Sequence, residues 1–253
     1  MNTEKILEQL TNNISKSEIV KEPFAHKYIE DVFPKDFYLS LLENIPKKNN
    51  YTAINKTGTV SPDYNDERFI FNFLDQNDNI KLTDTQKIFF KEIEKILFSK
   101  NLFETVTSNF KLTLDENLKN LSEQEKTSFG FPNLEFNIRS ALIKDFTKYS
   151  LGAHTDGVLK FITFLFYIPS HKDLKNNGTS LYEPLQSISS EKHFSLEETK
   201  KYFKKIKTCP FIPNSVLIFP RTARSFHGVE EINIFQKERN LLLLNYNLQK
   251  KVK

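Results

Sequence analysis

The chain has 253 residues, 38% of them hydrophobic, and a formal net charge of +4 at pH 7. This size allows one sizeable core, and we expect a single domain over residues 1–253. No apolar run reaches the roughly 18 residues of a membrane span, and the polar first ten residues do not resemble a secretory leader. Cys209 has no second cysteine to pair with, which fits a reducing, cytoplasmic setting. The modest charge gives no sign of a nucleic-acid partner.

Residues 1–132 have the periodicity of a helix-rich region. Proline suits a first helical turn, so Pro34 is expected to begin a helix. Thr83 and Gln86 have the spacing of a capping box and predict the start of another. The expected elements are a helix within 1–20, a strand at 26–32, helices at 34–45, 83–99 and 102–112, and short strands near 68–74 in an irregular stretch, 47–82.

After about residue 133 apolar residues alternate with a period of two, which is typical of strands. Strands are expected at 133–142, 159–168, 211–219, 225–232 and 239–248. Residues 170–210 are expected to form an insertion, with a helix from Ser195 whose basic C-terminal half, Lys200 to Lys207, is solvated. Helices followed by strands predict an α+β, mainly β fold: a sandwich or barrel with helices packed outside it.

Three separated positions suggest metal chemistry. His154-Thr155-Asp156 lies at a predicted turn between strands, where both side chains can point to one metal ion, although a loop histidine is the alternative. His227 is on a later predicted strand. Arg239 begins the last apolar strand, where a buried guanidinium needs an anion and suits a carboxylate.

Two imidazoles and one carboxylate on one face of an iron ion leave three coordination positions open. A 2-oxo acid can fill two of them, dioxygen can take the third, and a deeper arginine can hold the distal carboxylate. We therefore predict His154, Asp156 and His227 as metal ligands and catalytic residues, with Arg239 as the anchor of the 2-oxo acid.

The order and spacing of these residues resemble the iron(II)- and 2-oxoglutarate-dependent oxygenases, especially their prolyl-hydroxylase-like branch. The resemblance covers most of the chain, including Pro23-Phe24, Gly178–Leu181 and Ser215–Phe219. It implies a double-stranded β-helix, a cupin-like jelly roll, at 133–250 with N-terminal flanking helices. It also implies Fe(II), 2-oxoglutarate and O2, and a hydroxylase that attacks an unactivated C–H and releases succinate and CO2.

Two positions depart from that pattern, and a third narrows the range of expected reactions. Leu241 stands where relatives often carry Ser or Thr, so Tyr149 or Thr163 is expected to complete the 2-oxoglutarate site. Asn245 replaces the second arginine of nucleic-acid demethylases, which argues against DNA repair. Asp156 is present where related halogenases lack the carboxylate, which favours hydroxylation or desaturation.

The substrate is expected to be a polar or anionic small molecule or side chain. Arg139 and Arg221 are candidate substrate-binding residues, with an edge ion pair and a solvated loop as the respective alternatives. Loops at 50–80 and 170–210 are expected to cover the barrel mouth. The candidate residues in these loops are Tyr64, Arg68, Lys172 and Tyr182.

The remaining histidines, His26, His171 and His193, have no partner at ligand spacing and are expected to be structural or surface residues. Two other functions remain open. A cupin-type iron dioxygenase that works without 2-oxoglutarate would not need Arg239. A non-catalytic jelly-roll binding module would consume no oxygen. The sequence predicts no oligomeric state.

Overall fold

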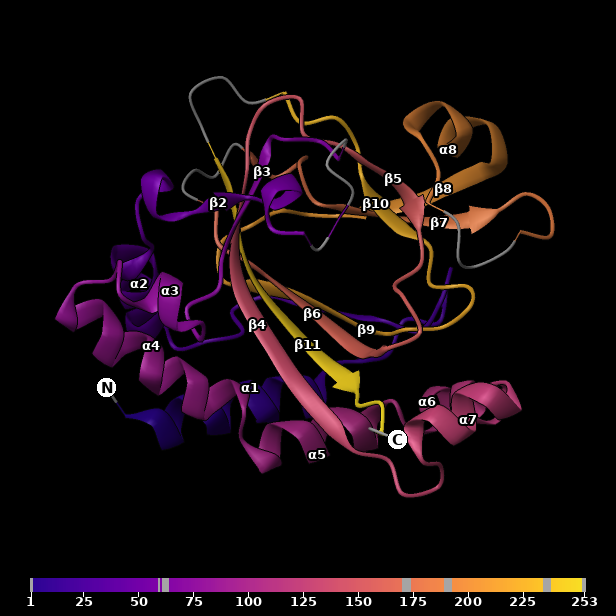
Figure 1. Cartoon of the computed structure of the whole chain (residues 1–253), viewed down its shortest axis with the longest axis horizontal. Coiled ribbons are helices and arrows are strands. Elements are labelled where there is room, and N and C mark those ends of the chain that lie inside the picture. Colours follow the sequence, from indigo (N-terminus) through magenta and orange to yellow (C-terminus); the bar gives the residue numbers. More distant parts are fainter. Residues whose placement is uncertain are drawn as a thin grey trace.

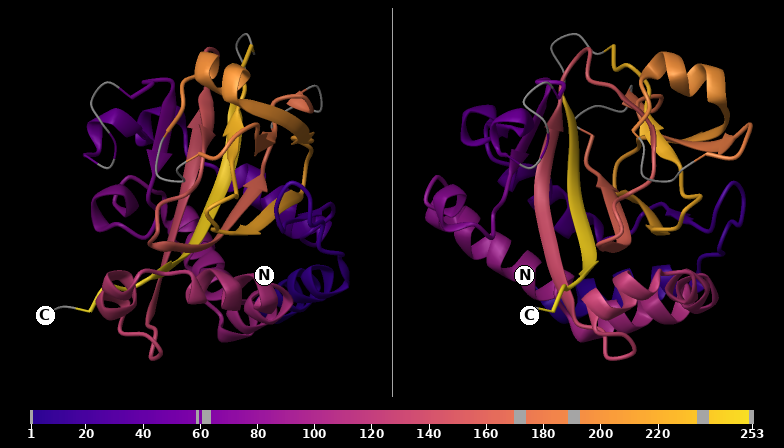
Figure 2. Two further views of the ribbon diagram at one scale, coloured as in Figure 1. Left: turned by 90° about the vertical axis from the view of Figure 1, so that its right-hand side faces the viewer. Right: turned by 45° about the vertical axis from the view of Figure 1, so that its right-hand side comes forward.

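The computed structural model describes residues 2–58, 60, 64–169, 174–188, 193–233 and 238–251. Two antiparallel sheets face each other in the second half of the chain, and helices from the first half cover the outer face of the larger sheet (Figures 1 and 2). The inner faces of the two sheets enclose the cavity described below.

The larger sheet has the strand order β1-β9-β6-β11-β4-β3-β2 and the smaller sheet the order β5-β10-β7-β8. From β4 to β11 the chain alternates between the sheets, except that the consecutive strands β7 and β8 pair within the smaller sheet; this is the arrangement of a double-stranded β-helix and confirms the predicted jelly roll. The strand bounds are β1 (Lys27–Ile29), β2 (Thr52–Ala53), β3 (Arg68–Phe71), β4 (Phe136–Asp145), β5 (Leu151–His154), β6 (Lys160–Tyr167), β7 (Thr179–Pro184), β8 (Phe203–Cys209), β9 (Ser215–Pro220), β10 (His227–Val229) and β11 (Arg239–Leu248).

The central strand β11 distributes its side chains by strict alternation. Leu242, Leu244 and Tyr246 lie in the core between the sheet and the helices. Arg239, Leu241, Leu243 and Asn245 line the cavity on the other face. The predicted strand at 239–248 matches β11 at both ends because this alternation begins and ends with it.

Helix α1 contributes the fully buried Leu10 and Ile14 to the same core as Phe164 and Leu244 of the sheet. Burying such side chains contributes roughly 1.5–3 kcal/mol each, which fixes the helices on the sheet. The helices are α1 (Thr3–Lys16), α2 (Lys35–Asn44), α3 (Gln76–Asn79), α4 (Asp84–Leu97), α5 (Lys100–Asn109), α6 (Lys111–Lys119), α7 (Glu123–Phe129) and α8 (Leu196–Tyr202), with short 3-10 turns at Lys48–Asn50 and Ile54–Lys56.

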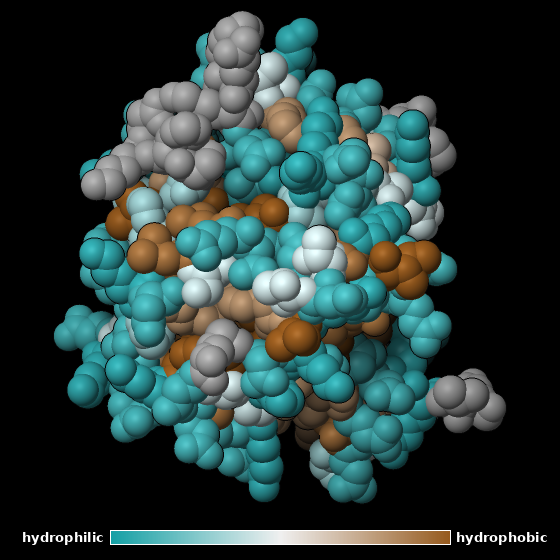
Figure 3. Space-filling model, turned by 90° about the vertical axis from the view of Figure 1, so that its left-hand side faces the viewer, coloured by the Kyte–Doolittle hydropathy of each residue, from teal (hydrophilic) through white to brown (hydrophobic). Residues whose placement is uncertain are grey.

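Among the described residues, none of these helices has the length and apolar character that crossing a membrane requires. On the face that carries α2, α3 and β2, apolar residues lie in small groups among hydrophilic ones (Figure 3). Leu39 of α2, Ile80 directly after α3 and Ile88 of α4 are exposed large apolar residues.

The capping box predicted at Thr83–Gln86 forms, and the helix predicted from Ser195 begins with a second capping box, Ser195–Glu198. Two sequence-based expectations about helices were wrong. The single helix expected at 102–112 is divided at Phe110, which ends α5 and begins α6. The basic helix after Ser195 ends at Tyr202, and Lys204, Lys205 and Lys207 lie on β8.

Pairing with β7 explains why the lysine-rich segment after Tyr202 is a strand. Six residues of β8 pair with β7 in antiparallel register, from Thr179 with Cys209 to Pro184 with Phe203. Such tertiary pairing overrides the weak local preference of a lysine-rich segment. Because β8 is an edge of the smaller sheet, its lysines also disfavour pairing with another chain.

Candidate metal and co-substrate site

A cavity of about 330 Å³ lies between the two sheets. The larger sheet contributes inward side chains of β3, β4, β6 and β11, and the smaller sheet contributes residues of β5, β7 and β10. We call the part around Arg239 and Thr179 the deep end, because both residues are almost fully buried. The part around Arg139 and Lys160 is the outer end, because Arg139 is exposed to solvent and the Lys160 side chain is one-third exposed.

His154, Asp156 and His227 converge in this cavity. His154 ends β5 and His227 begins β10, and the two residues are paired directly in the smaller sheet. Asp156 follows β5 in the turn toward β6. One potential ligand atom from each of the three residues lies within 4.8 Å of the others, and all three residues are buried. The backbone pairing of β5 with β10 therefore sets the spacing of the two imidazoles.

Both imidazoles are oriented by backbone carbonyls. Nδ1 of His154 lies 3.1 Å from the carbonyl oxygen of Gly152, and Nδ1 of His227 lies 2.9 Å from that of Ser225. A carbonyl oxygen can only accept a hydrogen bond, so each Nδ1 carries the proton. Each Nε2 is then left as a lone-pair donor, which is the form that a metal ligand needs.

Asp156 is held by three neighbours. The Thr163 hydroxyl donates to Oδ2 at 2.7 Å and itself accepts from the Asn245 side-chain amide at 2.9 Å. The Lys160 ammonium donates to Oδ1 at 2.6 Å. Arg221 Nε donates to the Asp156 backbone carbonyl at 3.1 Å. The carboxylate is thus fixed by two residues of β6, with Asn245 of β11 supporting Thr163, and the loop after β9 holds the Asp156 backbone.

The protonation states of these groups suit metal binding. Burial, together with the neighbouring His227, lowers the pKa of His154 well below its ordinary value, and burial also lowers the pKa of His227. Burial alone would raise the pKa of Asp156, but the Lys160 ammonium and the two histidines outweigh it and hold that pKa below its usual range. Two neutral imidazoles and one ionised carboxylate result.

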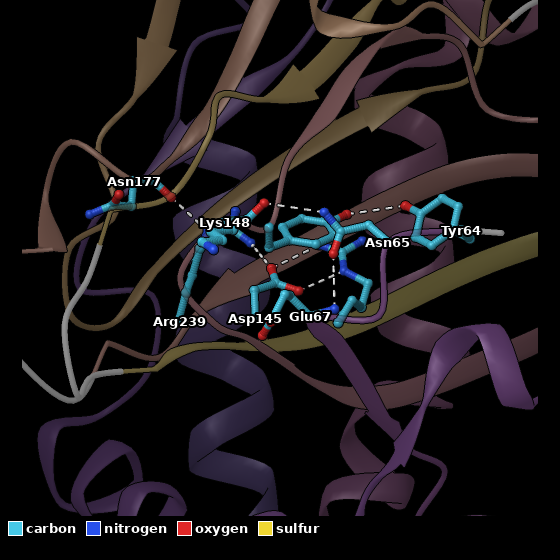
Figure 4. A network of polar contacts seen from close by, with 9 residues as sticks. Tyr64, Asn65, Glu67, Asp145, Lys148, Asn177 and Arg239 are labelled. Atoms are coloured by element: carbon cyan, nitrogen blue, oxygen red, sulfur yellow. Dashed lines mark hydrogen bonds and ion pairs between the residues drawn. The ribbon is translucent and has the colours of Figure 1, made fainter.

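At the deep end of the cavity Arg239 and Arg68 share the carboxylate of Asp145. Figure 4 labels Arg239 and Asp145. Arg239 Nη1 donates to Asp145 Oδ2 at 2.6 Å, and Arg239 Nε donates to the Asn177 carbonyl at 2.6 Å. Arg68 makes a two-point contact with Asp145, from Nε to Oδ1 at 2.6 Å and from Nη2 to Oδ2 at 2.8 Å. Two guanidinium groups against one carboxylate leave a local excess of one positive charge.

Two buried polar groups at this end have no hydrogen-bond partner. They are Arg239 Nη2 and the Thr179 hydroxyl, and both residues line the cavity. The nearby Tyr167 hydroxyl accepts from the Thr179 backbone N–H at 3.3 Å. Buried polar groups are rarely left unpaired, so an arginine Nη2 and a hydroxyl that both lack a partner in one cavity indicate a site for an anion.

Thr179 escaped the sequence-based selection of site residues. The segment Gly178–Leu181 is in the order that the resemblance requires, but nothing along the chain places Thr179 opposite Arg239. Leu241, which stands where the resemblance predicts a Ser or Thr, lines the cavity two residues after Arg239 and has no hydroxyl group. The hydroxyl comes instead from β7 in the opposite sheet.

Tyr149 and Thr163, the expected co-substrate contacts, have other partners. Arg68 lies 4.1 Å above the Tyr149 ring, and the Tyr149 hydroxyl is 3.2 Å from that of Tyr64. Tyr149 is not among the residues that line the cavity, whereas Thr163 lines it and is occupied with Asp156 and Asn245. Tyr149 therefore supports Arg68 from behind, and Thr163 orients the carboxylate.

The candidate substrate residues are separated by the fold. Arg139 lines the outer end of the cavity, whereas Arg221 is buried beneath the Asp156 turn and does not line it. Tyr64 and Arg68 line the cavity, but Tyr182 is buried in a separate apolar cluster with Phe203. Lys172 falls outside the described residues, as does His171.

Of the other histidines, His193 is the exception to the expectation of a purely structural or surface role. It lines the cavity, and its ring stacks on His154 with centroids 4.8 Å apart and planes 15° apart. His26 is fully buried and does not line the cavity. Because His193 comes from the segment before α8, far along the chain from His154, no spacing rule could connect the two.

Comparison with solved structures identifies the fold. The carbocyclase SnoK of nogalamycin biosynthesis, a non-heme α-ketoglutarate-dependent enzyme, matches with a TM-score of 0.51 and 11% identity over 98% of this chain and 86% of its own. The chain has the fold of that enzyme. A prolyl-4-hydroxylase of Pseudomonas putida matches with a TM-score of 0.48 and 9% identity over 95% and 98% of the two chains. A Trichoplax adhaerens prolyl hydroxylase, in complex with a peptide fragment of the hypoxia inducible factor, gives 0.48 and 12% over 97% and 88%. No family model and no curated protein sequence matches the chain.

Proposed function

We propose that this chain is an iron(II)- and 2-oxoglutarate-dependent dioxygenase. It hydroxylates an unactivated C–H of a polar small molecule or side chain and releases succinate and CO2. One observation carries the proposal: the unpaired Arg239 Nη2 and the unpaired Thr179 hydroxyl lie in the same cavity as the His154, Asp156 and His227 cluster. A carboxylate site and a metal site in one cavity suit a 2-oxo dicarboxylic acid.

The donor set fits iron(II). Two neutral imidazole Nε2 atoms and one carboxylate form a facial group of three that leaves other coordination positions open. Their orientation is fixed without the metal, by the Gly152 and Ser225 carbonyls and by Thr163. A site prepared in this way selects both the geometry and the protonation state of its ligands. When bound, iron with 2-oxoglutarate and O2 would supply the oxidising power for C–H hydroxylation.

The deep end fits the distal carboxylate of 2-oxoglutarate. Arg239 Nη2 would donate to one carboxylate oxygen, the Thr179 hydroxyl would donate to the same group, and the anion would neutralise the local excess charge. Asp145 keeps the other Arg239 edge occupied, so a single N–H edge faces the cavity. Arg239 and Thr179 are thus the proposed co-substrate residues, while Tyr149 acts through Arg68.

An apolar belt separates the two polar ends of the cavity. Ile143 of β4, Leu241 and Leu243 of β11 and Leu165 of β6 line it between Arg239 and Asn245. Apolar walls exclude water from the space beside the metal ligands and strengthen the electrostatic contacts at both ends. The chain's own contribution to catalysis is therefore to orient the reactants and to exclude water from them.

An anaerobic titration tests the proposal directly. Iron(II) and then 2-oxoglutarate are added to the protein, and the weak visible metal-to-ligand charge-transfer band of the chelate is followed. We expect a band in the wild type, none in His154→Ala or His227→Ala, and at least tenfold weaker 2-oxoglutarate binding in Thr179→Val and Arg239→Leu, since a hydrogen bond to a charged group contributes about 1.5–3 kcal/mol. Thr179→Ser, which keeps the hydroxyl, is the matched control.

The same titration separates the alternatives. Iron binding without a 2-oxoglutarate band would favour a cupin-type dioxygenase that does not use the 2-oxo acid, and oxygen consumption in Arg239→Leu without 2-oxoglutarate would support it. If iron does not bind at all, the three residues are not a metal site and a binding module becomes the better account.

A further inference from the structure

We infer that the substrate carries a carboxylate or phosphate group, which Arg139 and Lys160 hold at the outer end of the cavity; the inference rests on the proposed function. Among the described residues that line the cavity, four are cations and one is an acid. The cations are Arg68, Arg139, Lys160 and Arg239, and the acid is Asp156.

The positive charges at the two ends of the cavity are too far apart to be neutralised by the same anion. Arg139 and Asp145 are six residues apart on β4, a span of about 20 Å at the ~3.4 Å rise of an antiparallel strand. Arg68 and Arg239 already share Asp145 at the deep end, and the distal carboxylate of 2-oxoglutarate completes their balance. That anion cannot also serve Arg139 and Lys160 at the outer end.

Arg139 has no partner of its own. It makes no hydrogen bond or ion pair with any other described residue. Strand register places Arg139, Asn245 and Thr163 side by side on the inner face of the larger sheet, and Thr163 contacts Asp156. Arg139 therefore belongs to the same row of side chains that supports the metal ligand.

Lys160 has one partner, Asp156, at 2.6 Å. That carboxylate is a proposed metal ligand, and a divalent cation beside it takes up the negative charge that now neutralises the ammonium. Lys160 is one-third exposed and has a flexible stem, so it can turn from Asp156 toward an incoming anion. With a metal ion bound, the outer end of the cavity would present two cations without counter-charges, which favours an anionic substrate over a neutral or cationic one.

Inorganic phosphate is the probe, titrated calorimetrically into protein that already holds nickel(II) and 2-oxoglutarate, so that no turnover occurs. We expect wild type to bind phosphate, and Arg139→Gln and Lys160→Gln to bind it at least tenfold more weakly, with 2-oxoglutarate affinity unchanged in Arg139→Gln. Arg224→Gln, an exposed arginine outside the cavity, is the matched control and should behave as wild type. The same titration with acetate distinguishes a carboxylate from a phosphate: the anion that binds more tightly indicates which of the two groups the substrate carries.

The outcomes distinguish this inference from the function on which it rests. If 2-oxoglutarate binds but phosphate and acetate bind equally to wild type, Arg139→Gln and Lys160→Gln, or do not bind, the anion site is wrong and the proposed function stands. If 2-oxoglutarate itself does not bind to metal-loaded protein, the proposed function fails and the substrate inference fails with it.

Discussion

Asp145 holds the deep end of the cavity together, because its one carboxylate is shared by two guanidinium groups. Its side chain is fully buried, as is that of Arg239, and Arg68 is nearly so. Without the carboxylate, two positive charges would lie close together in a place that water hardly reaches. Asp145 is therefore a positioning residue: it contacts neither reactant and determines which edge of Arg239 faces the cavity.

Asp145→Asn should lower both stability and co-substrate binding. Removing one partner of a buried ion pair costs about 3–5 kcal/mol, so we expect a loss of this size in the free energy of unfolding, measured by urea denaturation. Asp115→Asn is the control, since Asp115 pairs with Lys111 on an exposed helix face and its change should stay below about 1 kcal/mol. A loss no larger than that of Asp115→Asn would contradict the assigned role.

The sequence allowed four residues of the site to be selected, but not how all of them are used. His154, Asp156, His227 and Arg239 were recognisable because motif spacing along strands carries information about a shared site. The spacing of residues along the chain does not show which residues of one sheet face those of the other. For this reason the sequence did not predict that Thr179 of β7 belongs to the site, or that His193 stacks on His154.

Among the structural elements, the close approach of β10 to β5 brings the two imidazoles together. A Cβ at Gly228 would lie 2.4 Å from the Leu151 carbonyl oxygen and 2.9 Å from that of Gly152. Real Cβ atoms do not come so close to backbone atoms, so any side chain at position 228 would push β10 away from β5. His227 is the next residue and would move with the strand.

Gly228→Ala is expected to weaken metal binding at least tenfold while the fold persists, because one displaced ligand of three loses its geometry. Calorimetric titration with nickel(II) measures the affinity, and far-ultraviolet circular dichroism checks the fold. Gly157→Ala is the matched control: Gly157 also lines the cavity, but a Cβ there would meet nothing within 4 Å. Equal affinities in the two variants would show that strand spacing does not set the site.

Strand prediction succeeded where one strand carries its own pattern and failed where pairing decides. The alternation of β11 is complete within its own sequence, so its bounds were predictable. β5 has four residues, too few for a period to emerge, and was not predicted, whereas the three residues of β10 lie within the longer strand predicted at 225–232. α7 was missed although its Ser122–Glu125 capping box was readable, because the helix has only seven residues and little apolar periodicity.

For the molecule as a whole, buried neutral histidines make stability depend on pH. His26 is fully buried, and burial lowers its pKa from 6.5 to about 4. Its Nδ1 lies 2.7 Å from the Phe24 carbonyl, whereas Nε2 has no partner that would stabilise a positive charge. The unfolded chain binds a proton at this residue more readily than the folded chain, so acidification favours unfolding.

The free energy of unfolding should therefore fall as pH drops from about 6.5 toward 4, and His26 should contribute no further loss below that. Between pH 7 and pH 5 the contribution of His26 is roughly 2 kcal/mol from the shift of its pKa. Urea denaturation of wild type and His26→Gln at both pH values isolates it, since the variant cannot titrate at this position. An identical pH dependence in both proteins would mean that His26 is not the sensitive group.

The Lys160–Asp156 ion pair gives the protein its own counter-charge for the carboxylate that would bind metal. In small zinc domains the ion holds the chain folded, and a chelator unfolds them. Here one apolar core joins the helices to the larger sheet, a second apolar cluster joins the larger sheet to the smaller one, and Lys160 neutralises Asp156. A bound metal ion would replace the Lys160 ammonium as the counter-charge of Asp156 without a change of fold. Protein treated with a chelator should therefore remain folded and bind metal again.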